Sequence, residues 1–451
     1  MTFFELGLSE PILTALTERG YSNPTAIQQQ AIAPLLAGRD IVASAQTGTG
    51  KTASFVLPLL EMFSGTHTRR AKRLRALILV PTRELAMQVE ATIGQYGKHL
   101  DIRSMAMVGG VDGEAQKQRL IDGIDILVAT PGRLLDMAHQ RALYFDELKA
   151  LVLDEADRML DMGFIGDINK IIERLPTQRQ TMLFSATLSD DVRQLARTAI
   201  DNAVEVSVLT EPDSGPQIDQ WLVTVDKDNK SALLSHLIEQ QQWGQALIFI
   251  RTKHGAAKLV TQLEKRGIEA EAIHSGRSQV VRSQLLQDFK SGQIKLLVAT
   301  GIAARGIDID DLQRVVNYDL PDDADDYIHR IGRTGRAGAR GEAISLVSRD
   351  DFKRLCAIEG RQQQVIPRRD IEGFGAQKTV PISVLNHIRT AAISKTRGHG
   401  NKPPKKEASL SSDTSHSSRK SSATGNKNNS AKSSPASTTQ PWGNWQKDKG
   451  Q

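Results

Sequence analysis

The sequence predicts an α/β protein built from two doubly wound parallel sheets. Short apolar runs of strand length alternate with helical patterns as far as about residue 350, which is typical of parallel sheets. The alternation occurs twice, once on each side of a breaker-rich stretch at residues 210–216. The 451 residues also exceed the length to which a single hydrophobic core usually grows, so we expect two domains.

The first half of the chain contains five apolar runs that we expect to form strands. They are Ile41–Ser44, Leu77–Val80, Ile126–Ala129, Leu151–Leu153 and Met182–Phe184. Each run is followed at once by polar residues or glycine. Because ligands bind outside the carboxyl ends of the strands in doubly wound sheets, the chemistry of the protein should collect in these following segments.

The second half repeats this pattern with four apolar runs. The sequence of Ile126–Thr130 is almost the same as that of Leu296–Thr300. The four runs are Ala246–Ile250, Leu296–Ala299, Val315–Asn317 and Ala343–Val347. We therefore expect a first domain at residues 1–209, a linker at residues 210–217 and a second domain at residues 218–370.

The remaining residues, 371–451, form a basic low-complexity tail. They hold 13 Lys and Arg against 4 acidic residues, so the tail carries +9 in a chain whose net charge is +6. From about His399 the tail is rich in Ser, Lys, Asn, Gly and Pro and has too few apolar residues to pack, which predicts disorder. Residues 350–398 are open to two interpretations, a short ordered extension or a binding motif.

Two absences in the sequence limit the class of protein. Cys356 is the only cysteine, which excludes an intrachain disulfide and fits a reducing compartment. The first residues lack the basic and apolar regions of a signal peptide, and no stretch reaches the length of a membrane span. We therefore expect a soluble, cytoplasmic protein that makes no membrane contact.

A glycine-rich segment follows the first predicted strand and opens a helical pattern, which is the context of a phosphate-binding loop. Its residues are Ala45, Gln46, Thr47, Gly48, Thr49, Gly50, Lys51 and Thr52. Glycines let backbone N–H groups converge on phosphates, while Lys51 neutralises the β and γ oxygens and Thr52 ligates Mg²⁺. The first position holds Ala45, where the general pattern has glycine.

Two adjacent carboxylates, Asp154 and Glu155, stand at the end of the run Ala150–Leu153. In a phosphate-loop site, such a pair can hold Mg²⁺ and direct a water at the γ-phosphate. We expect Asp154 to hold the metal and Glu155 to orient and deprotonate the attacking water. A solvated strand end is the alternative interpretation, and the presence of a phosphate loop earlier in the same chain makes it less attractive.

A basic segment in the second half, His329 to Arg336, can supply positive charge to the far side of the γ-phosphate. Arg333 and Arg336 are the candidates for an arginine finger, which contributes about 10³ to 10⁵ in rate. They would reach the nucleotide only when the two domains close. The alternative is a basic surface loop without a phosphate partner.

These motifs and their order resemble those of the DEAD-box ATP-dependent RNA helicases over about residues 3–350. The resemblance implies two RecA-like domains and an RNA-stimulated ATPase that hydrolyses ATP to ADP and phosphate, with ATP and Mg²⁺ as cofactors. The sequences of residues 43–46 and 157–164 look most like those of the bacterial RhlE-type branch of this family.

The resemblance also implies roles for individual residues. Tyr21 and Gln28 would recognise adenine, and Asp308 would contact the ribose. RNA contacts are implied for Pro81, Thr82, Arg83, Gly109, Gly110, Thr130, Pro131, Gly132, Arg133, Arg282 and Thr300. Coupling of the ATP site to RNA is implied for Ser185, Thr187, Asp157 and His329. Gly301 departs from the family pattern, in which Asp or Ser follows the threonine.

The implied activity is local, non-processive unwinding or remodelling of RNA and RNA–protein complexes. Small residues, backbone amides and arginines suit phosphates and 2′-hydroxyls, so RNA would be bound without sequence selection. ATP and single-stranded RNA would close both domains on a bent strand that a duplex cannot match. By analogy with the branch, ribosome assembly or RNA turnover is the expected pathway, with ribosomal precursor particles or the RNA-degradation machinery as partners.

Two other functions use the same motifs. The protein could be an ATP-dependent RNA clamp or annealing factor, which a duplex-release assay beside an annealing assay would distinguish. It could also be a DNA helicase or another P-loop motor, which would respond differently to RNA and DNA. The basic tail is either a solubilising extension or a segment that raises nonspecific affinity for RNA.

Overall fold

The computed structural model describes residues 1–45, 48–66, 70–208, 218–301, 312–335 and 340–383. The predicted linker at residues 210–217 and the tail from residue 384 onward lie outside the described residues, as do Gln46, Thr47, Asp308 and Arg336. In the described part of the chain, no helix is long and apolar enough to cross a membrane.

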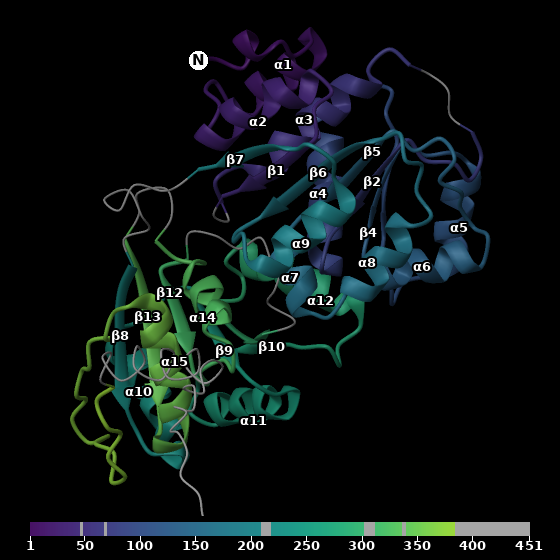
Figure 1. Ribbon diagram of the computed structural model, residues 1–451. Coiled ribbons are helices and arrows are strands. Elements are labelled where there is room, and N and C mark those ends of the chain that lie inside the picture. The colour runs from purple at the N-terminus through teal and green to yellow at the C-terminus, as the bar shows by residue number, and fades with distance from the viewer. Residues whose placement is uncertain (46–47, 67–69, 209–217, 302–311, 336–339, 384–451) are drawn as a thin grey trace, which may run out of the picture. The chain divides into compact units, whose positions relative to one another are not determined.

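The first sheet has seven strands in the order β3-β4-β2-β5-β6-β1-β7, and all of its strand pairs are parallel (Figure 1). Its strands are β1 (Ile41–Ser44), β2 (Ala76–Leu79), β3 (Ser104–Met107), β4 (Ile126–Ala129), β5 (Ala150–Leu153), β6 (Gln180–Ser185) and β7 (Val204–Ser207). Because parallel strands share one direction, the loops after these strands all open at the same edge of the sheet.

Helices cover both faces of the first sheet. They are α1 (Glu10–Glu18), α2 (Ala26–Leu36), α3 (Lys51–Phe63), α4 (Arg83–Tyr96), α5 (Gly113–Ile121), α6 (Pro131–His139), α7 (Ala156–Asp161), α8 (Ile165–Ile172) and α9 (Asp190–Ala199). Alternate strand residues face opposite layers, so Ile41 and Ala43 pack with α2, α3 and α4, while Val42 packs with α6 to α9. Burial on both faces explains why the central strands are continuous apolar runs.

Helix α3 directly follows the phosphate loop and is buried along almost its whole length. Phe55 and Phe63 are at most 1% exposed, and the Phe55 ring lies 5.2 Å from the ring of Phe184 on β6. Each such side chain contributes about 2 kcal/mol of burial free energy. The start of α3 is therefore held firmly beside the sheet edge.

The second sheet has six parallel strands in the order β10-β11-β9-β12-β13-β8. Its strands are β8 (Ile218–Thr224), β9 (Ala246–Ile250), β10 (Glu271–Ile273), β11 (Leu296–Thr300), β12 (Arg314–Asn317) and β13 (Gly341–Val347). Its described helices are α10 (Lys230–Gln240), α11 (Lys253–Glu264), α12 (Gln279–Lys290), α14 (Ala324–Ile331) and α15 (Phe352–Gln362). Buried side chains from α10 and α11 pack on one face, and those from α12, α14 and α15 pack on the other.

All nine predicted strand runs form strands, within two residues at each end. The prediction missed β3, β7, β8 and β10, which are the two edge strands of each sheet. Edge strands are less completely buried, and sequences such as Val204–Ser207 mix polar with apolar residues. They therefore lack the continuous apolar run on which the prediction depended.

The chain after α15 stays packed on the second sheet as far as Ser383. Leu222 of the edge strand β8 donates its N–H to the Pro367 carbonyl at 2.8 Å and accepts from Arg369 N–H at 2.9 Å. The Phe374 ring lies 5.2 Å from the His236 ring, and Val380 is buried. The segment that follows α15 thus covers the outer edge of β8, beyond residue 370, where we predict that the tail begins.

Candidate functional site

The predicted motifs follow the carboxyl ends of neighbouring strands in the first sheet, in an order that groups them by role. The loops after β3, β4 and β2 carry the predicted RNA contacts, and these three strands are adjacent. Next come β5 with the acidic pair, β6 with Ser185, and β1 with the phosphate loop. The acidic segment therefore lies between the predicted RNA loops and the phosphate loop.

The phosphate loop has the backbone that the prediction requires. Gly48 and Gly50 have φ angles of 83° and 93°, in the left-handed region, and a Cβ on Gly50 would collide with the Gln28 amide. Lys51 is 6% exposed and donates from Nζ to the Ala45 carbonyl at 2.7 Å. Burial lowers the pKa of Lys51, against the nearby carboxylates. Its ammonium thus lies inside the loop, where it would meet phosphate oxygens.

Gln28 joins the predicted adenine-recognition segment to the phosphate loop. Its Oε1 accepts from Thr25 N–H at 2.9 Å in a capping box at the start of α2, and its Nε2 donates to the Gly50 carbonyl at 3.2 Å. Tyr21 is 46% exposed, with its ring 6.4 Å from the Tyr96 ring in an edge-on arrangement. The structure therefore places Gln28 at the loop and leaves much of Tyr21 available for stacking.

Of the acidic pair after β5, Asp154 is buried and Glu155 has 12% of its side chain exposed, and the two carboxylates differ in their electrostatic surroundings. Burial, together with the neighbouring Glu155 carboxylate, raises the pKa of Asp154 to about 7. Burial also acts to raise the pKa of Glu155, but Arg158, Arg333 and Lys51 together lower it below the ordinary value. Glu155 is thus held as a carboxylate, as a general base requires, while Asp154 lacks sufficient positive charge around it.

The residues present fit a magnesium ion held partly by nucleotide phosphates. Within the described ranges, no group of three or more His, Cys, Asp or Glu side chains could hold a metal alone. Mg²⁺ at such sites usually takes only one or two protein ligands in addition to phosphates and waters. The raised pKa of the buried Asp154 indicates a carboxylate that a cation would stabilise, and Thr52 stands in the first turn of α3.

Asp157 connects the acidic segment directly to the segment after β6. Its Oδ2 accepts from Ala186 N–H at 3.0 Å, from Thr187 N–H at 2.9 Å and from Thr187 Oγ1 at 3.2 Å. In return, Asp157 N–H donates to Ser185 Oγ at 3.3 Å. The predicted coupling residues Ser185, Thr187 and Asp157 therefore form one hydrogen-bonded unit.

The predicted RNA contacts of the first sheet form two local groups. The Arg83 guanidinium lies against Gly109 and Gly110, whose missing side chains leave it room, and Thr82 caps α4 by accepting from Leu85 N–H at 3.3 Å. Pro81 precedes this cap.

The second of these groups starts α6 after β4. It consists of Thr130, Pro131, Gly132 and Arg133. Arg133 donates to Asp136 Oδ2 at 2.8 Å and to Gln116 Oε1 at 3.3 Å.

In the second sheet's basic segment, the described residues interact with the acidic pair. Arg333 is 6% exposed, and its charge helps to lower the pKa of Glu155. Burial lowers the pKa of His329 to about 4, and Arg158 acts in the same direction, against Asp157 and Glu155. The structure thus brings His329 and Arg333 within electrostatic range of the acidic pair.

Helix α12 carries Gln279 and Arg282, and both contact Glu84 on α4. Gln279 Nε2 donates to Glu84 Oε1 at 3.0 Å, and Arg282 pairs with the same oxygen at 2.8 Å. In the described part of the chain, the buried Arg282 Nε and Gln279 Oε1 have no hydrogen-bond partner. Arg282, a predicted RNA contact, thus pairs with a protein carboxylate, and its Nε–H has no partner among the described residues.

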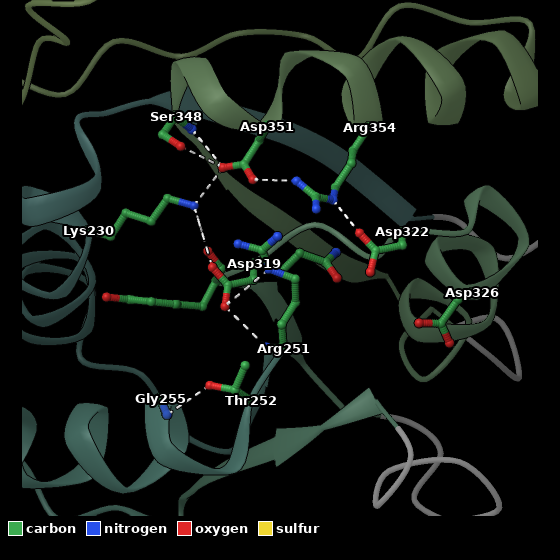
Figure 2. Close-up of polar contacts among 12 residues, drawn as sticks. Lys230, Arg251, Thr252, Gly255, Asp319, Asp322, Asp326, Ser348, Asp351 and Arg354 are labelled. Atoms are coloured by element: carbon green, nitrogen blue, oxygen red, sulfur yellow. Dashed lines mark hydrogen bonds and ion pairs between the residues drawn. The ribbon is translucent and has the colours of Figure 1, made fainter. Parts of the chain in front are cut away.

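Thr300 opens on a cavity of about 300 Å³ at the carboxyl edge of the second sheet. Arg251, which directly follows β9, also lines this cavity, as do Lys253 and Ser275 (Figure 2 shows Arg251). A Cβ on Gly301 would lie 3.2 Å from the Arg330 guanidinium, which pairs with Asp326 at 2.9 Å. The Arg330–Asp326 pair therefore lies where a side chain at position 301 would project.

Sequence reasoning missed several residues of this site. Arg158 pairs with Glu155 at 3.2 Å, and its i, i+3 spacing from Glu155 on a helix is a signal for such a pair. Arg251 follows a strand at the carboxyl edge, the same placement that identified the other motifs. Glu84 gives no local signal, because its partners lie about 195 residues later.

Fold and site together define a P-loop nucleotide hydrolase with two parallel sheets. The sequence matches the family described as DEAD/DEAH box helicase over residues 25–195 and the helicase conserved C-terminal domain over residues 229–338. With relatives about 40% identical over most of its length, the chain belongs to the DEAD-box ATP-dependent RNA helicases, which are RNA-stimulated ATPases.

Among the relatives is the DEAD-box ATP-dependent RNA helicase CshA of Bacillus cereus, 40% identical over 82% of this chain and 70% of its own. The RNA helicase CrhR of Synechocystis sp. is 42% identical over 81% of this chain and 73% of its own.

Similar solved structures include S. cerevisiae Dbp5 bound to RNA and ADP BeF3, with TM-score 0.73 and 33% identity. That match covers 82% of this chain and 95% of the other. The DEAD-box helicase Mss116 bound to ssRNA and UDP-BeF matches with TM-score 0.73 and 29% identity, over 82% of this chain and 79% of the other. Both support RecA-like domains for the two sheets.

Proposed function

We propose that this helicase couples ATP binding and hydrolysis to local, non-processive unwinding or remodelling of RNA and RNA–protein complexes. In this proposal, Glu155 activates the attacking water, and Lys51, Arg333 and Arg336 neutralise the phosphates. Asp154 and Thr52 would hold Mg²⁺, which would polarise the γ-phosphate. Tyr21 and Gln28 would recognise adenine.

RNA would be held through its backbone. The residues that we assign to it are threonines, glycines, arginines and two prolines, most of them in loops or at helix starts. Apart from the prolines, they offer backbone amides or cationic groups to phosphates. Contacts to phosphates and 2′-hydroxyls carry no sequence information, so binding without sequence selection is expected. That Dbp5 and Mss116 were solved with RNA supports a shared RNA site.

The observation that carries the proposal is the hydrogen-bonded unit of Asp157 with Ser185 and Thr187. It joins the acidic segment to the loop after β6, with the predicted RNA loops and the phosphate loop on either side along the sheet order. A change at the nucleotide would therefore displace the same backbone that flanks the RNA loops, and the reverse also holds.

The deciding experiment compares ATPase stimulation by RNA and by DNA of the same sequence, beside duplex-release and annealing assays. We expect strong stimulation by RNA alone and release of short RNA duplexes in the presence of ATP. Equal stimulation by DNA would contradict an RNA helicase. Annealing without duplex release would instead identify an RNA clamp or annealing factor. Glu155→Gln serves as the inactive control.

The cellular setting extends this proposal. We expect a cytoplasmic protein of the RhlE-type branch that acts in ribosome assembly or RNA turnover, on ribosomal precursor particles or with the RNA-degradation machinery. The relatives reported above carry other names, so the assignment to this branch depends on the sequences of residues 43–46 and 157–164. Pull-down of RNA and protein from cells during ribosome assembly would test it.

A further inference from the structure

We propose that Lys230, which is buried and distant in sequence from every motif, is a positioning residue of the RNA-phosphate pocket. It acts through Asp319 on Arg251, which would contact a phosphodiester oxygen. The inference rests on the proposed RNA-binding function of the cavity that Thr300 lines.

Lys230 is the first residue of α10 and is only 2% exposed. Its Nζ donates to the Tyr318 carbonyl at 2.9 Å and to Asp351 Oδ2 at 3.0 Å, and lies 3.9 Å from Asp319 Oδ1 (Figure 2). Three oxygens from two separate loops therefore converge on one buried ammonium group.

Asp319 links Lys230 to the loop after β9, because its two carboxylate oxygens face different partners. Its Oδ1 faces Lys230, while its Oδ2 accepts from Arg251 N–H at 3.1 Å and lies 3.8 Å from Arg251 Nε. The Asp319 N–H donates to the Phe249 carbonyl at 3.2 Å. One carboxylate thus orients both the backbone and the guanidinium of Arg251, and Lys230 fixes that carboxylate.

Arg251 has a third of its side chain exposed, and it lines the cavity together with Lys253 and Thr300. Three acidic residues also line the cavity, and each has a partner. Asp326 pairs with Arg330, Asp322 accepts from Arg354 at 2.6 Å, and Asp323 caps α14 by accepting from Asp325 N–H at 3.1 Å. Cationic groups beside a threonine hydroxyl suit a phosphodiester, which a guanidinium can bind through two N–H groups.

The second partner of Lys230, Asp351, is equally buried. Burial acts to raise the pKa of Asp351, but Lys230 and the hydrogen bonds from Ser348 keep it below the ordinary value. Buried ion pairs often contribute less to stability than apolar residues of the same volume would. The buried Lys230–Asp351 pair is therefore better explained by its fixing the position of Lys230, which in turn orients Asp319.

The test is a double-mutant cycle with Lys230→Met and Arg251→Met, read by binding of a fluorescein-labelled oligouridylate in the presence of a nonhydrolysable ATP analogue. We expect each single change to weaken binding about tenfold, and the double change to weaken it no further. Each should also reduce the slope of log affinity against log salt by about 0.7, the value of one phosphate contact on a single strand.

The salt slope distinguishes positioning from general destabilisation, because Lys230 is too deeply buried to touch RNA itself. Weakening that multiplies in the double variant, or an unchanged salt slope in Lys230→Met, would overturn the proposal. If Lys230→Met does not fold, Asp319→Asn replaces it in the cycle with the same expected outcomes, since Asn keeps the size of the side chain without its charge.

Arg361→Met is the control, because it breaks an exposed arginine–aspartate pair between α15 and α14, with Asp325 at 2.8 Å, and neither residue lines the cavity. Its RNA affinity and salt slope should equal those of the parent. The parent protein separates the two levels of inference. If RNA neither binds nor stimulates it, the proposed function fails; if RNA does both and the cycle is additive, only the role of Lys230 fails.

Discussion

Glu155 adopts a left-handed backbone conformation, with φ 52° and ψ 51°, at the point where β5 ends and α7 begins. A residue with a Cβ is held there at a cost of about 1 kcal/mol or more, which the surrounding structure must offset. The conformation brings its carboxylate to Arg158 and into the field of Arg333. The strained backbone thus orients the side chain, and the charges of Arg158, Arg333 and Lys51 keep its carboxylate ionised.

At this scale we predict that Glu155→Gln stops turnover and leaves nucleotide binding intact. The amide keeps the size of the side chain but cannot accept the proton of the attacking water, so RNA-stimulated ATPase should fall by about 10² to 10⁴. Steady-state phosphate release and binding of a fluorescent ATP analogue would measure the two effects. Glu114→Gln, at an exposed position on α5, is the control. ATPase near the parent rate would exclude Glu155 as the base.

At the scale of elements, the central strands were predictable because both of their faces are buried. A run such as Ala150–Leu153 has no polar position, so its type and its place inside a parallel sheet follow from composition. The edge strands β3, β7, β8 and β10 needed the structure, since their pairing on one side only leaves polar residues in the pattern. Most residues of the candidate site follow central strands, so the burial pattern that predicts these strands also indicates where the candidate site lies.

Helix α14 carries the clearest pH-dependent group, His329. Its pKa is lowered from 6.5 to about 4 in the folded protein, first by burial and then by Arg158. Between these values the unfolded chain takes up a proton that the folded chain does not. Stability is therefore complete above pH 6.5 and is lost as the pH falls toward 4.

We predict that the parent protein loses about 2 kcal/mol of unfolding free energy between pH 7 and pH 5 relative to His329→Asn. Urea unfolding of both proteins at the two pH values would measure the difference. Asp154, whose pKa is raised, contributes with the opposite sign in both proteins and cancels in the comparison. A difference that stays constant with pH would show that His329 is not held neutral by burial.

At the scale of the whole molecule, the chain after α15 consists of two parts with different roles. Residues 364–383 cover β8 and bury Ile366 and Val380, whereas the residues beyond hold 12 Lys and Arg against 3 acidic residues. The first part contributes to the second sheet's core. The second part contributes charge, and we expect it to raise nonspecific affinity for RNA by counterion release.

Two truncations test this division. Ending the chain after Ser383 should leave thermal stability and RNA-saturated ATPase unchanged, while RNA affinity at low salt and its salt dependence both fall. Ending it after Gln363 should cost about 3 kcal/mol of stability, because the edge of β8 and its apolar neighbours lose their cover. Thermal melting and RNA titrations at several salt concentrations measure both. Unchanged RNA affinity after the first truncation would indicate a solubilising tail.

By itself, the sequence determined the two parallel sheets, the phosphate loop, the acidic pair and the order of the motifs, since these depend on local patterns of burial and on short spacings. Only the tertiary structure decided which groups meet. The contacts of Glu84 with α12, of Asp157 with Thr187 and of Lys230 with Asp319 join residues far apart in the chain. Such contacts depend on how strands are ordered in a sheet, and no local pattern of side chains encodes that order.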